Sequence, residues 1–171
     1  NVADSVVDSE KLNDEAWAKT LYVIAEEKAS SANEYQNIAK SIGQKETLND
    51  REWAEELFKK AIERASNASE YRKIAEGIAA ENGLGNKVWA SEIFQKAINA
   101  SSSLMDYQFI ANSIADELCL DDKVFGAEVM KKGIDAFGIE DVVKRRGGAA
   151  VEPVFVDIGR RDAEASGEIE D

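Results

Sequence analysis

Apolar residues recur along this chain at a fixed interval of 36 residues. Self-similarity at a constant period is the signature of repeat proteins, in which each unit buries its apolar face against its neighbours. The sequence therefore predicts an array of stacked repeats. Two of the aligned columns are aromatic: Trp17, Trp53, Trp89 and Phe125 in one, and Tyr35, Tyr71 and Tyr107 in the other.

Each repeat contains two helical patterns. In the first, Tyr35, Ile38, Ala39 and Ile42 have the i, i+3, i+4, i+7 spacing of one helix face, which predicts a helix over about 31–44. A second helix is predicted over about 50–65, with one apolar face made of Trp53, Ala54, Leu57, Phe58 and Ala61. The pattern predicts an all-α fold built from helical hairpins.

Polar residues mark where these helices begin. Each first helix is preceded by a small polar residue with an acid three positions later, the spacing of a capping box: Ser31 and Glu34, Asn67 and Glu70, Ser103 and Asp106. Asparagine and aspartate doublets precede the second helices and predict their N-caps: Asn13-Asp14, Asn49-Asp50 and Asp121-Asp122.

The repeat pattern divides the chain into an array and a tail. Ala3, Ser5 and Val6 match Ala39, Ser41 and Ile42 of the next unit, so we expect the chain to begin inside a helix of an earlier unit and to be part of a longer protein. The last segment has no helical period, which predicts a flexible C-terminal tail. The predicted segments are an array over 1–140, with a partial unit at 1–30 and units at about 31–66, 67–102 and 103–138, and a tail at 141–171.

The helices resemble those of the tetratricopeptide-like α-solenoids. The family's patterns are aromatic-x2-Leu-Gly-x2-Tyr in the first helix and Ala-x3-Phe-x2-Ala in the second. The matching stretches here are Tyr35-x2-Ile38-Ala39-x2-Ile42 and Ala54-x3-Phe58-x2-Ala61, with their repeats in later units. The period of 36 exceeds the family's usual value of about 34, as in its longer-loop subclass. The resemblance, over about 3–138, implies a right-handed superhelical solenoid whose first helices line a concave, ligand-binding groove.

Composition narrows the classes of function. With 34 acids and 21 bases, the net charge of −13 disfavours nucleic acid and anionic membranes as partners. The absence of histidine excludes histidine-based catalysis and metal sites, and the single cysteine cannot form an internal disulfide. We therefore expect no enzyme, no cofactor and no metal. No apolar run is long enough to span a membrane, and the composition suits the cytoplasm.

The outward positions of the first helices are the predicted partner-binding residues. They vary between units while the core columns do not, as partner recognition requires, although drift on a solvated face produces the same variation. Phe109 stands out because Asn37 and Lys73 occupy its column. The predicted set is Asn33, Gln36, Lys40, Gln44, Arg72, Glu76, Gln108, Phe109, Asn112 and Asp116.

The sequence is compatible with several functions. The leading hypothesis is a protein–protein interaction scaffold that binds a peptide or protein through the groove. The alternatives are a structural spacer or self-assembling array in a larger protein, which would form a homo-oligomer, and a regulatory arm of an enzyme outside this sequence. The apolar stretch 151–158 of the tail would cap the stack or dock at Phe109. The basic triplet 144–146 is too short to be a localisation or nucleic-acid signal.

Two further predictions concern particular side chains. Cys119 stands in a column that holds Lys11, Thr47 and Gly83, and this variation predicts a partly exposed thiol. In successive second helices an acid is followed by lysine four residues later, which predicts ion pairs on the solvated face: Glu56 and Lys60, Glu92 and Lys96, Glu128 and Lys132.

Overall fold

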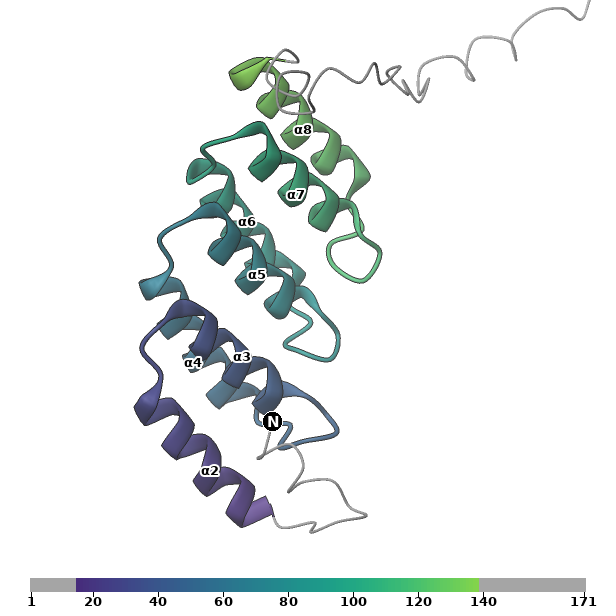
Figure 1. Cartoon of the computed structure of the whole chain (residues 1–171). Coiled ribbons are helices and arrows are strands. Elements are labelled where there is room, and N and C mark those ends of the chain that lie inside the picture. The colour runs from purple at the N-terminus through teal and green to yellow at the C-terminus, as the bar shows by residue number, and fades with distance from the viewer. Residues whose placement is uncertain (1–14, 139–171) are drawn as a thin grey trace, which may run out of the picture.

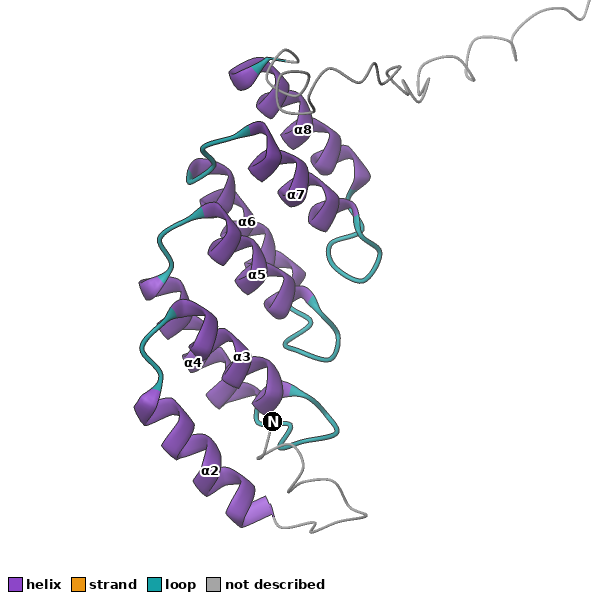
Figure 2. Ribbon diagram, viewed as in Figure 1, coloured by secondary structure: helices purple, strands orange, loops and turns teal. Residues whose placement is uncertain are grey.

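The computed structural model describes residues 15–138, which form seven α-helices and contain no strand (Figures 1 and 2). The prediction of an all-α fold is confirmed for this part of the chain. The expected start inside an earlier helix, at 1–14, and the predicted tail at 141–171 lie outside the described residues. The helices are α2 (Glu15–Lys28), α3 (Ala32–Gly43), α4 (Arg51–Arg64), α5 (Ala68–Ala79), α6 (Lys87–Asn99), α7 (Leu104–Ala115) and α8 (Lys123–Phe137).

The helices are stacked as pairs. Helix α3 packs most extensively on α4, α5 on α6 and α7 on α8, and a short loop joins the members of each pair (Figure 2). The first helices of successive pairs, α3, α5 and α7, also contact one another in that order (Figure 1). They form one layer of the stack, and this layer carries the predicted partner-binding residues.

The predicted caps at the starts of the first helices are confirmed. The Ser31 hydroxyl accepts a hydrogen bond from the Glu34 amide, and the Glu34 carboxylate accepts one from the Ser31 amide at 2.9 Å. The Ser30 amide donates to the same carboxylate at 2.8 Å. These bonds, led by that from the Ser30 backbone, lower the pKa of Glu34 to about 2. The Asn67 and Ser103 side chains likewise accept from the amides of Glu70 and Asp106 at the starts of α5 and α7. There the acid accepts a hydrogen bond from the amide of the residue before the cap, Ser66 or Ser102.

The loop inside each pair contains one residue in the left-handed region. Their φ angles are 52°, 63° and 57°, a conformation that glycine, asparagine and aspartate tolerate best. The residue after each of them caps the second helix, so the two members of the predicted doublets have separate roles. The left-handed residues are Asn49, Gly85 and Asp121, and the caps are Asp50, Asn86 and Asp122.

Aromatic contacts join the second helices of neighbouring pairs. Tyr22 of α2 meets Trp53 of α4 edge to face, with ring centroids 6.3 Å apart, and Phe58 of α4 meets Trp89 of α6 in the same geometry at 6.4 Å. Such pairs contribute about 0.5–1.5 kcal/mol beyond their buried area. Trp53 and Trp89 of the predicted tryptophan column therefore help to hold one pair of helices against the next.

A partly buried carboxylate strengthens the first of these contacts. The Trp53 indole N–H donates to Glu26 Oε2 at 2.7 Å, and Lys60 forms an ion pair with the same carboxylate. Burial alone would raise the pKa of Glu26, but the bonds from Lys60 and Trp53 outweigh it and lower the pKa. The predicted pairing of Lys60 with Glu56 is wrong, because the lysine reaches across to α2 instead. The two equivalent predicted pairs, Glu92 with Lys96 and Glu128 with Lys132, also form no ion pair within residues 15–138.

Candidate partner-binding site

A hollow of about 430 Å³ opens on the layer of first helices. Its walls come from α3, α5, α7 and the loop that follows α7, so residues far apart in the sequence meet there. Six of the ten predicted partner-binding residues line it: Lys40, Arg72, Glu76, Phe109, Asn112 and Asp116. The other lining residues are Ala80, Ser113, Leu118 and Cys119.

The remaining four predicted residues lie outside the hollow. Asn33 and Gln108 are exposed, and Gln44 is half-buried at the end of α3. Gln36 is buried, with only 6% of its surface exposed, so its assignment as an outward residue is wrong. Arg72, the equivalent residue one unit later, contacts Ser113 of α7, so its side chain faces the next first helix.

A polar network forms the centre of the hollow. Arg72 forms an ion pair with Glu76 one turn along α5. Ser113 of α7 donates to Glu76 Oε1 at 2.5 Å, and Arg72 Nη1 lies 3.4 Å from the Ser113 hydroxyl. Arg72 was predicted to bind a partner through its positive charge. This charge is instead neutralised by Glu76 of the same helix. The network instead fixes α5 relative to α7.

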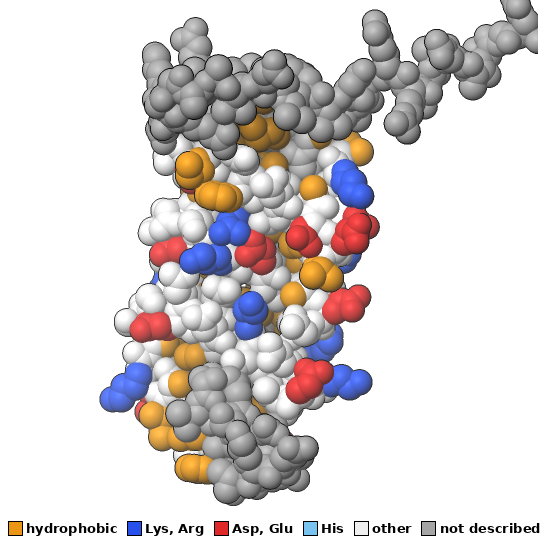
Figure 3. Space-filling model, turned by 45° about the vertical axis from the view of Figure 1, so that its right-hand side comes forward, with side chains coloured by type: hydrophobic (Ala, Val, Ile, Leu, Met, Phe, Trp, Pro, Cys, Tyr) orange, Lys and Arg blue, Asp and Glu red, His pale blue; other side chains and the backbone are white. Residues whose placement is uncertain are grey.

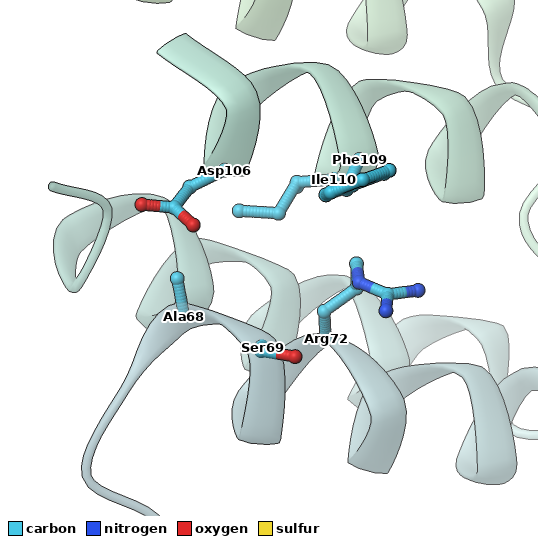
Figure 4. A pocket seen from close by; sticks show the side chains of 6 residues that line it. All are labelled: Ala68, Ser69, Arg72, Asp106, Phe109 and Ile110. Atoms are coloured by element: carbon cyan, nitrogen blue, oxygen red, sulfur yellow. The ribbon is translucent and has the colours of Figure 1, made fainter. Parts of the chain in front are cut away.

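Two exposed apolar side chains stand at the hollow. Phe109 is 52% exposed and Leu118 is 85% exposed. The Arg72 guanidinium lies 5.7 Å from the centre of the Phe109 ring and supports one side of it. Figure 4 shows Arg72 of α5 and Phe109 of α7 facing each other. Both line a small space of about 20 Å³ between the two helices. Solvated hydrophobic side chains of this size beside a hollow are typical of binding surfaces.

Charged groups of both signs surround these apolar side chains. Lys40 of α3 makes no ion pair within residues 15–138. On the other side, Asp116 is exposed, and its Oδ1 accepts the Leu118 amide at 2.8 Å. Figure 3 shows such small groups of acids and bases between apolar side chains on one face of the stack. The hollow can thus receive both apolar and charged groups of a ligand.

Cys119 lies at the hollow but is buried, with 6% of its surface exposed. The prediction of a partly exposed thiol is wrong, because the loop turns this side chain towards the core. Burial, reinforced by the negative charge of Glu76, raises the pKa of Cys119 to about 11. The thiol is therefore protonated near neutral pH and is a weak nucleophile.

Sequence reasoning missed Leu118 and Ser113 as residues of the hollow. A signal existed for Leu118, because the same column holds Glu46 and Asn82 in the other units. No comparable signal marks Ser113, whose role depends on the approach of α7 to α5.

No helix of the described part is long and apolar enough to cross a membrane. Within residues 15–138, no cluster of acids and cysteine is arranged to hold a metal ion. The chain matches no protein-family model, no curated protein and no solved structure. Because a fold alone does not imply a function, the function of this chain has to be inferred from the geometry of the hollow.

Proposed function

We propose that this chain is a non-catalytic protein-interaction module that binds a peptide or protein partner at the hollow between α3, α5 and α7. One observation carries the proposal: residues from three successive first helices converge there around the exposed ring of Phe109. Aromatic side chains that become fully buried on binding contribute most of the affinity of typical interfaces. A cytoplasmic location fits the single cysteine, which allows no internal disulfide.

The experiment is capture of partners from a lysate of the source organism, with the full chain as bait. Phe109→Asn places in the third unit the residue that the first unit carries at Asn37. The matched control is Val124→Glu, which removes another exposed apolar side chain, 72% exposed on α8, and installs the residue found at Glu52. A partner retained by the control and lost with Phe109→Asn supports the proposal. A partner retained equally by both variants contradicts it.

We also propose that the stack is a right-handed, tetratricopeptide-like solenoid. The 36-residue period, the paired helices and the recurring tyrosine and tryptophan columns support this assignment. An experimental structure tests it, because a left-handed stack, or helix pairs that do not repeat by a constant rotation, would contradict it.

A second candidate function is self-association through α2. Val23 and Ile24 are 46% and 48% exposed, whereas the corresponding positions of later units hold polar or basic residues. Those residues are Lys59, Gln95 and Lys131 in one column and Lys60, Lys96 and Lys132 in the other. Sedimentation over a range of concentrations tests this candidate. A mass that rises with concentration and stays monomeric in a Val23→Lys, Ile24→Lys variant would support it, and a monomer throughout would exclude it.

A further inference from the structure

The third unit differs from the other two on its outward face. Three of its exposed positions are apolar, Met105, Phe109 and Leu118, with 53%, 52% and 85% of their surfaces exposed. All six equivalent positions in the other units are polar and exposed: Asn33, Asn37, Glu46, Ser69, Lys73 and Asn82. Because the core columns repeat faithfully, stacking does not require this change. It marks the third unit as the part of the face that contacts an apolar group.

These three side chains follow one side of α7 and the loop after it. Met105 and Phe109 are four residues apart and therefore lie on the same face of the helix. Phe109 and Leu118 both line the hollow. The three residues, which we call the apolar track, thus run from the first turn of α7 to the hollow.

The end of the apolar track at Leu118 is acidic. The loop 116–122 contains four acids and no base, and Asp116 and Glu117 directly precede Leu118. Glu81, from the loop between α5 and α6, lines a neighbouring depression together with Glu117, Leu118 and Lys87. Asp116, Glu117 and Glu81 are all exposed. Besides burial, the negative charges of Glu76 and Asp116 help to raise the pKa of Cys119 on this side of the hollow, while the positive charge of Lys87 acts in the opposite direction.

Cations offset only part of this charge at the Leu118 end, where one lysine faces two acids in the neighbouring depression. Arg72 is already bound to Glu76 and Ser113, and Lys40 belongs to α3, on the opposite wall of the hollow. Lys87 is the base that faces the acids of the neighbouring depression. A ligand segment that crosses from the apolar track to the loop therefore meets carboxylates.

We propose that the partner's contact segment carries a bulky apolar side chain, which packs on Met105, Phe109 and Leu118, next to lysine or arginine residues that pair with Asp116, Glu117 and Glu81. This inference rests on the proposed function and specifies the chemistry of the partner at the same hollow. Apolar contact supplies most of the affinity, while the charges fix the direction of the segment and accelerate its association.

A phage-displayed library of random peptides, selected against the full chain, tests this chemistry. The expected consensus has an aromatic or large aliphatic residue with lysine or arginine within a few positions of it. Synthetic peptides with this consensus should bind the Phe109→Asn and Leu118→Asn variants at least about tenfold more weakly than the unmodified chain. Val124→Glu is the matched control and should bind as the unmodified chain does. Affinity should fall as the salt concentration rises.

The outcomes separate this inference from the proposed function. An acidic consensus whose binding is lost in Phe109→Asn would overturn the basic–apolar chemistry and leave the hollow as the binding site. Peptides that bind Phe109→Asn normally would overturn both.

The chain's own tail requires one more variant. The basic triplet 144–146 follows Val142 and Val143, and Phe155 in the apolar stretch 151–158 is followed by Arg160 and Arg161, so both segments have the proposed chemistry. One variant removes both as competitors within the full chain: Lys144→Glu, Arg145→Glu, Arg146→Glu, Phe155→Asn, Arg160→Glu, Arg161→Glu. Tenfold tighter peptide binding in that variant would show that the tail occupies the hollow and would overturn a separate partner, whereas unchanged binding supports one.

Discussion

Replacing Gly133 by alanine is expected to destabilise the protein, although the equivalent positions hold Ala25, Ala61 and Ala97. A Cβ atom on Gly133 would lie 2.5 Å from Tyr107 Cβ and 2.7 Å from Tyr107 Cγ. These atoms sit close to the backbone of α7, so rotation of the tyrosine side chain cannot relieve the clash. Helices α7 and α8 would have to move apart, which would also disturb the contact of Tyr107 with Phe137, whose ring centroids are 6.0 Å apart.

Two effects of opposite sign set the magnitude. Overpacking a core costs about 1–3 kcal/mol, and replacing glycine by alanine inside a helix contributes about 1 kcal/mol of stability. The expected net loss is therefore about 1 kcal/mol, with an upper bound of about 2 kcal/mol. For a chain of this size, 1 kcal/mol corresponds to a fall of roughly 2–4 °C in the melting temperature.

Urea unfolding of the full chain, followed by circular dichroism, measures this loss. Ala127→Gly is the matched control, because Ala127 is exposed on the same helix and its replacement changes helix propensity alone. The Ala127→Gly replacement should lower the free energy of unfolding by about 1 kcal/mol. If Gly133→Ala instead gained the stability that Ala127→Gly loses, the close packing of α7 on α8 would be refuted.

Three further predictions concern a loop, a helix start and the thiol. Gly85→Ala should lower the free energy of unfolding by about 1–2 kcal/mol, because a φ of 63° disfavours alanine even though the new methyl group would touch nothing within 4 Å. Urea unfolding measures this change, and an unchanged stability would contradict the prediction. Glu34 has a folded pKa of about 2, below its usual 4.5, so its contribution to stability is present above about pH 4.5 and is lost as the pH falls towards 2. Glu34→Gln should therefore flatten the fall in unfolding free energy over that range, and an identical acid profile would argue against it. Cys119, buried and with a pKa raised to about 11, should be alkylated near neutral pH far more slowly in the folded than in the urea-unfolded chain, and equal rates would contradict its burial.

The helices could be predicted closely because their signals are local. The expected ranges 31–44 and 50–65 compare with Ala32–Gly43 and Arg51–Arg64 in the structure. A capping residue stands directly before each apolar stripe, so the sequence marks the start of each helix independently of the stacking.

The features that sequence reasoning missed depend on how the units stack. The burial of Gln36 and the reach of Lys60 to Glu26 involve helices from neighbouring units. One of these contacts did leave a signal, since Glu26 stands in a column that otherwise holds Ile62 and Ile98. A carboxylate in an apolar column requires hydrogen-bond donors, and Trp53 and Lys60 supply them.

The convergence at the hollow was predicted in part. The repeat pattern and the family resemblance pointed to the first helices, and six of the ten residues chosen there line one hollow, although the column of Gln36 was wrongly taken as outward. Periodicity could not show that Arg72 would be neutralised by Glu76, because the pairing depends on side-chain conformation and on Ser113 from the next first helix.

Recognition of a partner at the hollow is best tested by calorimetry, which measures the affinity of a captured partner for the unmodified full chain, Phe109→Asn and Val124→Glu. An aromatic side chain buries about 150–250 Å², so the 52% of Phe109 that is exposed leaves about 100 Å² for a partner to cover. At about 25 cal/mol per Å², this area corresponds to about 2.5 kcal/mol, or a weakening of roughly 50- to 100-fold. The account predicts that loss for Phe109→Asn and an unchanged affinity for Val124→Glu. Equal affinities for all three proteins would contradict recognition at the hollow.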